Sequence, residues 1–267
     1  MVDERTPLDI VPKILLVRRT LITFNVAGAE PSLLRGDGGE LLLVVAGSMI
    51  ASYAIAGALA RALSVVISRP GRNAQSLDGL VPVVLRLYTA ATDKTKLVML
   101  ERGFCEFALV GRDPSTQVTR AFYFFMVPRP DGVWECAARE EQIVELHPFF
   151  FGSAASDARE AWASRGDAGM LDVLRDVIPV TAKTGLPIQL ARVGPDGVVL
   201  FSTCDIVVNE VERVVTERYF VGPLQIDPRA MALDGGSMPT ATVLAARQTE
   251  VLRAQGYQIR EAFDVEA

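Results

Sequence analysis

The feature that most constrains the fold is a stretch of twenty residues without a charge, Leu41 to Ala60, which reads LLLVVAGSMIASYAIAGALA. A helix of this length and composition can span a bilayer. The same residues also fit a buried strand that turns at Gly47 into a buried helix. The choice between the two decides whether the chain belongs in a membrane.

The sequence within and around this stretch favours the strand and the helix. The positive-inside rule asks for basic residues at one end, but only Arg61 follows directly and Glu40 precedes it. The run LLLVV gives way at Gly47 to a segment rich in alanine, the best helix former. Ser48 is placed to cap that helix. We therefore expect strand, turn and helix, with a membrane anchor at residues 41–60 as the less favoured alternative.

Composition and charge exclude several classes of function. Half of the 267 residues are apolar and 22% are charged, so the chain is not disordered, and its mean hydropathy of +0.27 indicates a deep core, an obligate oligomer interface or a membrane segment. The net charge is −5 without a block of five basic residues, which argues against nucleic-acid binding. Three scattered cysteines and one histidine lack the spacing of a metal site and favour a reducing, cytoplasmic compartment. We expect neither a metal nor a cofactor, and the N-terminus does not resemble a secretory signal.

The rest of the chain predicts an alternation of strands, hairpins and helices. We expect strands at 11–26, 104–110, 120–127, 133–136, 187–193, 198–202 and 206–220, and helices at 77–91, 154–164, 168–183 and 240–255. Residues 28–39 and 223–238 are expected to be loops because glycine, proline and aspartate gather there. The sequence RPGR at 69–72 is expected to stop the first helix.

One order of elements occurs twice in the chain. The apolar run 143–153 ends in Gly-Ser and leads into an alanine-rich helix, as the run 41–48 does. In each half we expect a strand, Gly-Ser, two helices and a hairpin. Pairs of helices between hairpins predict an α+β fold in which helices cover two facing antiparallel sheets. We expect residues 1–210 to form this domain and 211–267 to form a C-terminal extension with a terminal helix.

This order of motifs resembles the proteasome β-subunit family of N-terminal-nucleophile hydrolases. The matching segments are VVAGSMIASYAIAGALARAL (44–63), LVPVVLRLY (80–88), CEFALVGRDPSTQVTRAFYFF (105–125), FFFGSAASDAREAW (149–162) and GLPIQLARVGPDGVVLF (185–201). They correspond to the family's first strand–turn–helix, second helix, central hairpin, second junction and late hairpin. The resemblance covers residues 40–205 and implies a four-layer αββα sandwich.

The resemblance implies site residues only in part. In the family, the glycine of the first turn donates its backbone N–H to the oxyanion, and the serine of the second junction supports the nucleophile. Those positions are Gly47 and Ser153 here. The family's nucleophile is an N-terminal threonine. The matching place near Met1 holds no hydroxyl, and neither Thr6 nor Thr20 opens the family's strand.

Further positions of the family pattern are also changed. Thr181 and Thr184 replace the family's later aspartate and serine, and Lys13 does not match the spacing of the family's lysine. The oxyanion turn therefore survives without the rest of the machinery. The same Gly47 would be kept for strand-to-helix geometry alone.

The leading hypothesis is a non-catalytic, proteasome-like structural subunit that assembles into a homo-oligomer or ring and can contact a peptide or protein partner. The alternative is an N-terminal-nucleophile or cysteine-dependent hydrolase of peptide or amide bonds. Its nucleophile would be a threonine uncovered by processing, or Cys105 or Cys136 paired with His147, the only histidine. A lone histidine is more often structural than catalytic.

Overall fold

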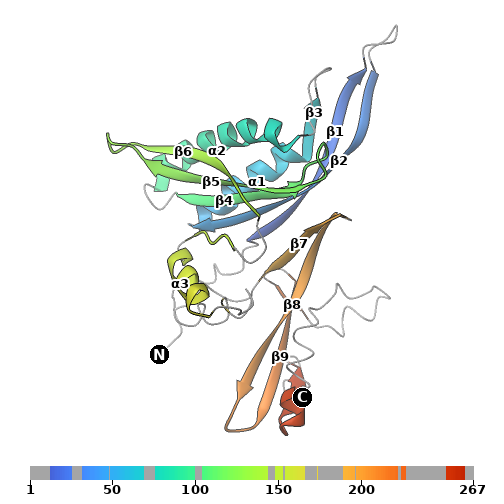
Figure 1. The fold of residues 1–267 in the computed structure, drawn as a ribbon, viewed down its shortest axis with the longest axis vertical. Coiled ribbons are helices and arrows are strands. Elements are labelled where there is room, and N and C mark those ends of the chain that lie inside the picture. The colour runs from blue at the N-terminus through green and yellow to red at the C-terminus, as the bar shows by residue number, and fades with distance from the viewer. Residues whose placement is uncertain are drawn as a thin grey trace. The chain divides into compact units, whose positions relative to one another are not determined.

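The computed structural model describes residues 13–25, 32–47, 49–68, 76–99, 104–143, 148–152, 154–165, 173, 189–195, 197–221, 224–226 and 251–261. By compactness the chain divides into a larger unit, Lys13–Thr184 with Val193–Val199, and a smaller unit of the remaining residues. Helices and strands mix in an α+β fold, as the sequence predicts (Figure 1). The domain boundary expected near residue 210 stays a prediction.

The larger unit is built on a six-stranded sheet. Its strands are β1 (Ile14–Asn25), β2 (Ser32–Gly47), β3 (Val65–Ser68), β4 (Cys105–Arg112), β5 (Thr119–Pro128) and β6 (Trp134–Glu141). They lie in the order β3-β1-β2-β4-β5-β6, and each neighbouring pair is antiparallel except β1 with β3, which is parallel. The predicted hairpin around the sequence GRDPST is therefore confirmed as β4 and β5, and the strand predicted at 133–136 is the start of the longer β6.

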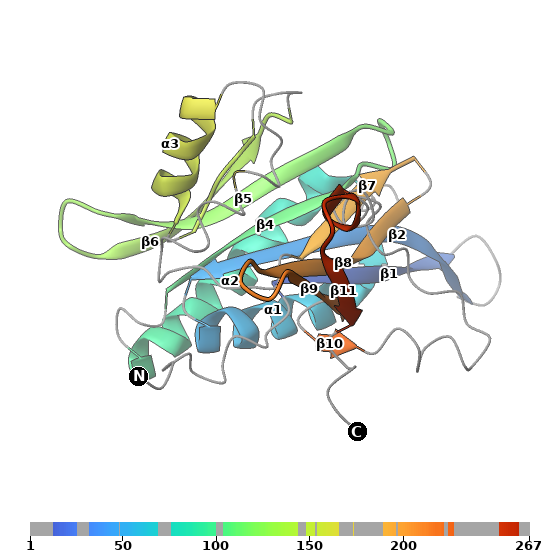
Figure 2. The ribbon, with the colours of Figure 1, turned by 90° about the horizontal axis from the view of Figure 1, so that it is seen from below.

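Two helices, α1 (Met49–Ser64) and α2 (Leu77–Met99), lie along one face of this sheet (Figures 1 and 2). Alternate strand residues point at them, because successive side chains of a strand face opposite sides. The core between the layers includes Leu41, Leu43, Phe107, Leu109 and Phe124 from strands and Ile55, Leu59, Leu80, Val84 and Tyr88 from helices. Each fully buried large apolar side chain stabilises the fold by ~1.5–3 kcal/mol.

The second face of the same sheet is also apolar and largely buried. Leu42 of β2, Ala108 of β4 and Tyr123 of β5 point away from the helices and are 4%, 6% and 8% exposed. Phe149 packs edge-on against Tyr123 with ring centroids 5.0 Å apart. The segment that leads into α3 (Ala155–Arg165) therefore lies on this second face. Strands that are buried on both sides are typical of a sheet inside a layered fold.

The smaller unit holds most of a second sheet. Its strands are β7 (Leu190–Gly194), β8 (Gly197–Asn209), β9 (Val214–Val221), β10 (Leu224–Ile226) and β11 (Gln258–Glu261). They lie in the order β10-β9-β8-β7, and β11 pairs with β9 in parallel. The tip of the β7–β8 hairpin, residues 193–199, belongs to the larger unit.

One segment expected to be a loop is a strand. Residues 32–39, the end of the predicted loop 28–39, belong to β2 and pair with β1 in a long hairpin. Gly38 looked like part of a turn, but its role is a close approach: a Cβ there would come 2.8 Å from the Cβ of Arg19. Arg19 sits at an irregularity of the β1–β2 register, between Arg18 and Thr20.

Three further expectations are corrected. Residues 65–68 form the strand β3 directly after α1, although the helix was expected to run on to RPGR. Residues 148–152, the described end of the apolar run 143–153, are not a strand, so the second copy does not have a strand directly before its glycine. The strand expected at 206–220 is broken by a turn at 210–213 into β8 and β9. The helix expected at 168–183 lies outside the described residues except for Val173.

The uncharged stretch that constrains the sequence is divided between two elements. Residues 41–47 are the end of β2, and residues 49–60 belong to α1, which is 16 residues long. Within the described part of the chain, no helix has the length and apolar character needed to cross a membrane. The strand–turn–helix expected here is the arrangement that forms.

Candidate functional site

The turn between β2 and α1 has the predicted geometry. Gly47 ends β2 with a φ of +101°, a region that favours glycine, and α1 begins two residues later. A Cβ at Gly47 would come 3.0 Å from the Cα of Cys105 and from the carbonyl oxygen of Phe104. The backbone at the start of β4 thus leaves no room for a Cβ at this position. Ser48, the expected cap, lies outside the described residues.

The second Gly-Ser junction lies against the first. Gly152 has a φ of +92°, and a Cβ there would come 2.8 Å from the Cβ of Ala46, the residue before Gly47. Ser153, the other site residue that the resemblance implies, lies outside the described residues. The structure therefore brings together the two places that the sequence singled out.

A carboxylate that sequence reasoning missed fastens this contact. Glu106 Oε2 accepts hydrogen bonds from the Tyr123 hydroxyl, at 2.6 Å, and from the backbone N–H of Gly152, at 3.1 Å. Glu106 lies opposite Ala46 in the β2–β4 register. Burial and the bond to the Glu106 carboxylate both raise the pKa of Tyr123 above its ordinary value. We call Ala46, Gly47, Glu106, Tyr123 and Gly152 the junction site.

The groups on the helix side of the junction site are a buried thiol and two hydroxyls that are hydrogen-bonded to the backbone. Cys105 is 1% exposed, and burial raises the pKa of its thiol to about 12. The Tyr88 hydroxyl donates to the Cys105 carbonyl oxygen at 2.5 Å, and the Ser52 hydroxyl donates to the Ala46 carbonyl oxygen at 3.2 Å. A protonated, enclosed thiol is a poor nucleophile. Burial also raises the pKa of Cys136, the other candidate.

Of the two candidate threonines, the structure describes Thr20, and Thr20 lies far from the Gly47 turn. Thr20 pairs with Asp37, ten residues before Gly47 in β2. At ~3.3 Å per residue of strand, this places Thr20 roughly 30 Å from the turn. Thr6 and His147, with the positions Met1 and Ser153, lie outside the described residues.

Lys13 lies nearer to the turn than its sequence spacing indicated. Its carbonyl oxygen accepts a hydrogen bond from the N–H of Val45 at 2.8 Å, two residues before Gly47. The long β1–β2 hairpin explains the difference, because it adds residues between Lys13 and Gly47 without adding distance. The family spacing could not anticipate this extension.

A second polar cluster surrounds the start of α2. The Asp113 carboxylate accepts hydrogen bonds from the backbone N–H of Leu77 at 2.9 Å and from that of Ser115 at 2.8 Å. Asp113 thereby caps α2 from the β4–β5 loop. Burial opposes its ionisation, but hydrogen bonds from Ser115, Leu77 and Thr116 outweigh burial and lower the pKa of Asp113 to about 2.

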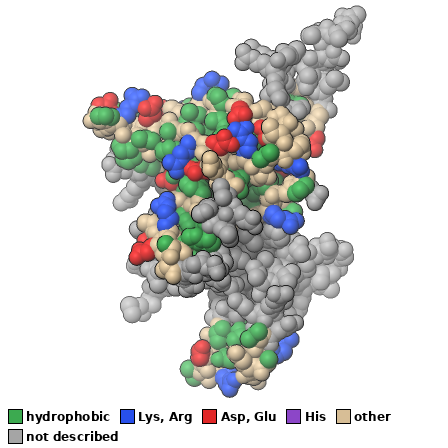
Figure 3. Space-filling model, in the orientation of Figure 1, with side chains coloured by type: hydrophobic (Ala, Val, Ile, Leu, Met, Phe, Trp, Pro, Cys, Tyr) green, Lys and Arg blue, Asp and Glu red, His purple; other side chains and the backbone are tan. Residues whose placement is uncertain are grey.

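Arg120 completes this cluster on the surface side. Its guanidinium makes two hydrogen bonds to Asp78 and two to Glu140, and its Nη1 lies 3.6 Å from the Asp113 carboxylate. These bonds raise the pKa of Arg120 above its ordinary value. On the face shown in Figure 3, basic and acidic side chains of the described residues are interspersed rather than gathered by sign. The cluster has the chemistry of a structural ion-pair network.

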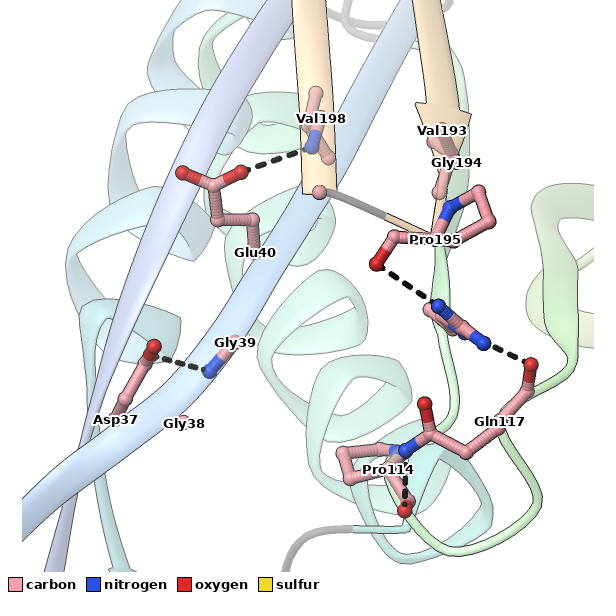
Figure 4. A pocket seen from close by; sticks show the side chains of 12 residues that line it. Asp37, Gly38, Gly39, Glu40, Pro114, Gln117, Val193, Gly194, Pro195 and Val198 are labelled. Atoms are coloured by element: carbon pink, nitrogen blue, oxygen red, sulfur yellow. Dashed lines mark hydrogen bonds between the residues drawn. The ribbon is translucent and has the colours of Figure 1, made fainter.

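A pocket of about 280 Å³ opens beside the β7–β8 tip (Figure 4). Its polar groups hold the tip in place: Arg112 Nη1 donates to the carbonyl oxygen of Pro195 at 2.8 Å, and Glu40 Oε2 accepts from the N–H of Val198 at 2.9 Å. Arg112 Nε also donates to the Gln117 carbonyl oxygen. Because Arg112 and Glu40 already serve this contact and Asp37 accepts from the Gly39 N–H, the pocket is best explained as a clamp.

The described residues contain no group of three or more histidine, cysteine, aspartate or glutamate side chains that could hold a metal ion. Sequence reasoning found Gly47 through its apolar flanks, but it missed Glu106, Tyr123 and Asp113, whose partners are distant in the chain. Comparisons of the chain with protein-family models, with curated proteins and with solved structures find no match.

Proposed function

We propose that the chain is a non-catalytic structural subunit, with a proteasome-like αββα sandwich, that assembles with copies of itself. The observation that carries the proposal is the state of the groups around Gly47. The Cys105 thiol is buried and protonated, and the Ser52 and Tyr88 hydroxyls are engaged with backbone carbonyls. Among the described residues, the Gly47 turn therefore has no free nucleophile beside it, which supports a structural role for the turn.

The sandwich is supported by the two faces of the six-stranded sheet. Helices α1 and α2 cover one face, and the residues Leu42, Ala108 and Tyr123 on the other are buried and apolar in character. A four-layer αββα arrangement requires a sheet of this kind, since its second face packs against another sheet.

Assembly is supported by large apolar side chains on the helix layer. Tyr53 of α1 is 62% exposed, and Val83, Leu87 and Leu97 of α2 are 39%, 37% and 84% exposed. Val83 and Leu87 are one turn apart and face the same direction. Apolar side chains on an outer helix layer favour contact with another protein surface, and the commonest partner for such a surface is a second copy of the same chain.

A hydrolase of amide or peptide bonds is the second candidate, because Lys13 and Glu106 both lie beside the Gly47 turn. That function needs a nucleophile from residues other than those described near the turn. It predicts that one residue reacts at stoichiometric yield with an electrophile.

Intact-mass spectrometry separates the two functions. The purified chain is incubated with iodoacetamide and, separately, with a threonine-directed epoxyketone, and each sample is compared with a urea-unfolded control. The proposal predicts no single-site adduct from the epoxyketone and no alkylation of Cys105 or Cys136 in the folded chain. A stoichiometric adduct at one threonine, or at one of these cysteines before unfolding, would overturn it. The assembly part is measured by light scattering.

A further inference from the structure

A second pocket, of about 330 Å³, lies between β6 and α3 in the larger unit. It is lined by Arg139, Pro148, Phe149, Phe150, Arg159 and Trp162. Two arginines and three aromatic residues thus line one hollow, and its described lining includes no acidic residue. This composition differs from that of the clamp pocket, whose charges are used to hold a hairpin.

The two arginines come from different elements and are each held in place. Arg139 of β6 lies over the rings of Tyr123, Phe125 and Phe149, 5.2–5.8 Å from their centroids, and its Nε donates to Glu141. Arg159 of α3 donates from Nη2 to the Phe150 carbonyl oxygen at 2.9 Å. A guanidinium that is fixed before binding loses less side-chain freedom when it meets an anion.

The aromatic walls are also fixed, each by a different cluster. Phe149 packs against Tyr123 and stacks on Phe151, with centroids 5.0 and 5.7 Å apart. Phe150 and Trp162 pack on the small core of Ala154, Ala158 and Val173. The pocket is therefore walled by rings that are held from behind.

We propose that this pocket binds a small ligand in which a carboxylate or phosphate is attached to an aromatic ring. The guanidinium groups match the oxygens of such an anion, because their N–H donors form a planar fork. The rings provide stacking surface for the flat part of the ligand. The volume lies within the range of small-molecule sites. Among the described residues, Glu141 is the carboxylate that contacts these arginines, and it neutralises at most one of the two charges.

Fluorescence of Trp162 in the full chain tests the proposal. The chain has two tryptophans, and Trp134→Phe leaves Trp162 as the only one while keeping an aromatic ring beside Phe104. The probes are phenylacetate and phenyl phosphate, with benzyl alcohol as the neutral ring and acetate as the anion without a ring. We expect saturable binding of an anionic aromatic probe at ~1 mM or below, and at least tenfold weaker binding of both controls. The order of the two anionic probes distinguishes a carboxylate ligand from a phosphate ligand.

Arginine variants assign the binding to the pocket. Arg159→Gln should weaken binding of the anionic probe about tenfold or more. Arg159→Lys should weaken this binding less, because lysine keeps the positive charge although it lacks the planar fork of N–H donors. Arg86→Gln, an exposed arginine of α2, is the matched control and should bind as the parent does. Circular dichroism confirms that each variant is folded. Equal binding of benzyl alcohol, unchanged binding in Arg159→Gln, or no saturation by either anionic probe would overturn the proposal.

Discussion

Gly152 lies against Ala46 so closely that a Cβ added to the glycine would come 2.8 Å from the Cβ of the alanine. This contact joins the second Gly-Ser junction to the first, and the Glu106 carboxylate holds it through the Gly152 N–H. Both glycines have positive φ, so both positions need glycine for geometry before any chemistry is considered. The junction site thus packs the end of β2 and the start of β4 against the segment that leads into α3.

Replacing Gly47 by alanine should destabilise the fold strongly. The new Cβ would meet backbone atoms of Cys105 and Phe104 at 3.0 Å, and a φ of +101° is itself strained for alanine. We expect the free energy of unfolding to fall by about 2–4 kcal/mol, measured by urea denaturation.

Gly57→Ala in α1 is the matched control for this variant. No heavy atom lies within 4 Å of its Cβ position, so the substitution should stabilise the fold by roughly 0.5–1 kcal/mol through helix propensity. If Gly47→Ala were as stable as the parent while Gly57→Ala behaved as expected, the close packing at the turn would be wrong.

Asp113 should make the fold sensitive to acid. Its pKa is about 2 in the folded chain and near 3.8 in the unfolded chain, so its ionised form stabilises the fold above pH 3.8. That stabilisation, about 2 kcal/mol, is lost as pH falls from 3.8 to 2. The unfolding free energy of Asp113→Asn should be lower at pH 7 by about 2–3 kcal/mol and should fall less over this pH range. Asp93→Asn, exposed on α2, should follow the parent curve, and identical curves for all three proteins would contradict the capping role.

The Cys105 thiol should resist alkylation in the folded chain. Its pKa of about 12 means that almost no thiolate is present at pH 8, and burial blocks access as well. Iodoacetamide followed by peptide mass mapping should find Cys105 labelled only after urea is added. Burial raises this pKa above its unfolded value. The protonated thiol therefore stabilises the fold fully below pH 9, and this stabilisation is lost between pH 9 and 12. Labelling of Cys105 without denaturant would count against the buried thiol.

Arg19 should be replaceable without loss of stability. It is 4% exposed, and its Nε and Nη2 have no hydrogen-bond partner among the described residues. Burial lowers its pKa, although the charges of Asp37 and Asp113 act in the other direction. Because methionine removes the desolvated charge and keeps most of the volume, Arg19→Met should leave the unfolding free energy unchanged or raise it by roughly 1–3 kcal/mol. Arg18→Met, whose side chain is 80% exposed, should change it by less than about 0.5 kcal/mol. A clear loss of stability in Arg19→Met alone would show that the buried charge is compensated.

The local residue pattern was enough to predict the helices, strands and turns whose formation depends mainly on neighbouring residues in the sequence. The turn at Gly47, the hairpin of β4 and β5 and residues 77–91 of α2 follow from apolar periodicity and glycine or proline signals, whereas the last eight residues of α2 were not predicted. The strand β3 could not be separated from α1, because the apolar residues of VVIS continue the helix pattern without a break. The sequence GDGG in β2 looked like a turn, because nothing in its own residues shows that Arg19 lies against Gly38.

The polar contacts that organise the larger unit could not be found in this way. Asp113 caps a helix that begins 36 residues earlier, and Glu106 binds a glycine 46 residues later. Such pairs depend on the register between strands, and one residue of shift would exchange the two faces. For the candidate site, the sequence therefore indicated Gly47, whereas Glu106 and Tyr123 were found only from the structure.

Self-assembly is tested most directly by light scattering on the full chain after size exclusion, over a wide range of protein concentration. We expect a defined mass of at least twice that of the 28.9 kDa chain. The double variant Val83→Lys with Leu87→Lys should shift that mass toward the monomer, because it places two charges on the exposed face of α2. Val133→Lys, an exposed apolar residue of the β5–β6 loop, should leave the mass unchanged. A strict monomer of 28.9 kDa at every concentration would contradict self-assembly.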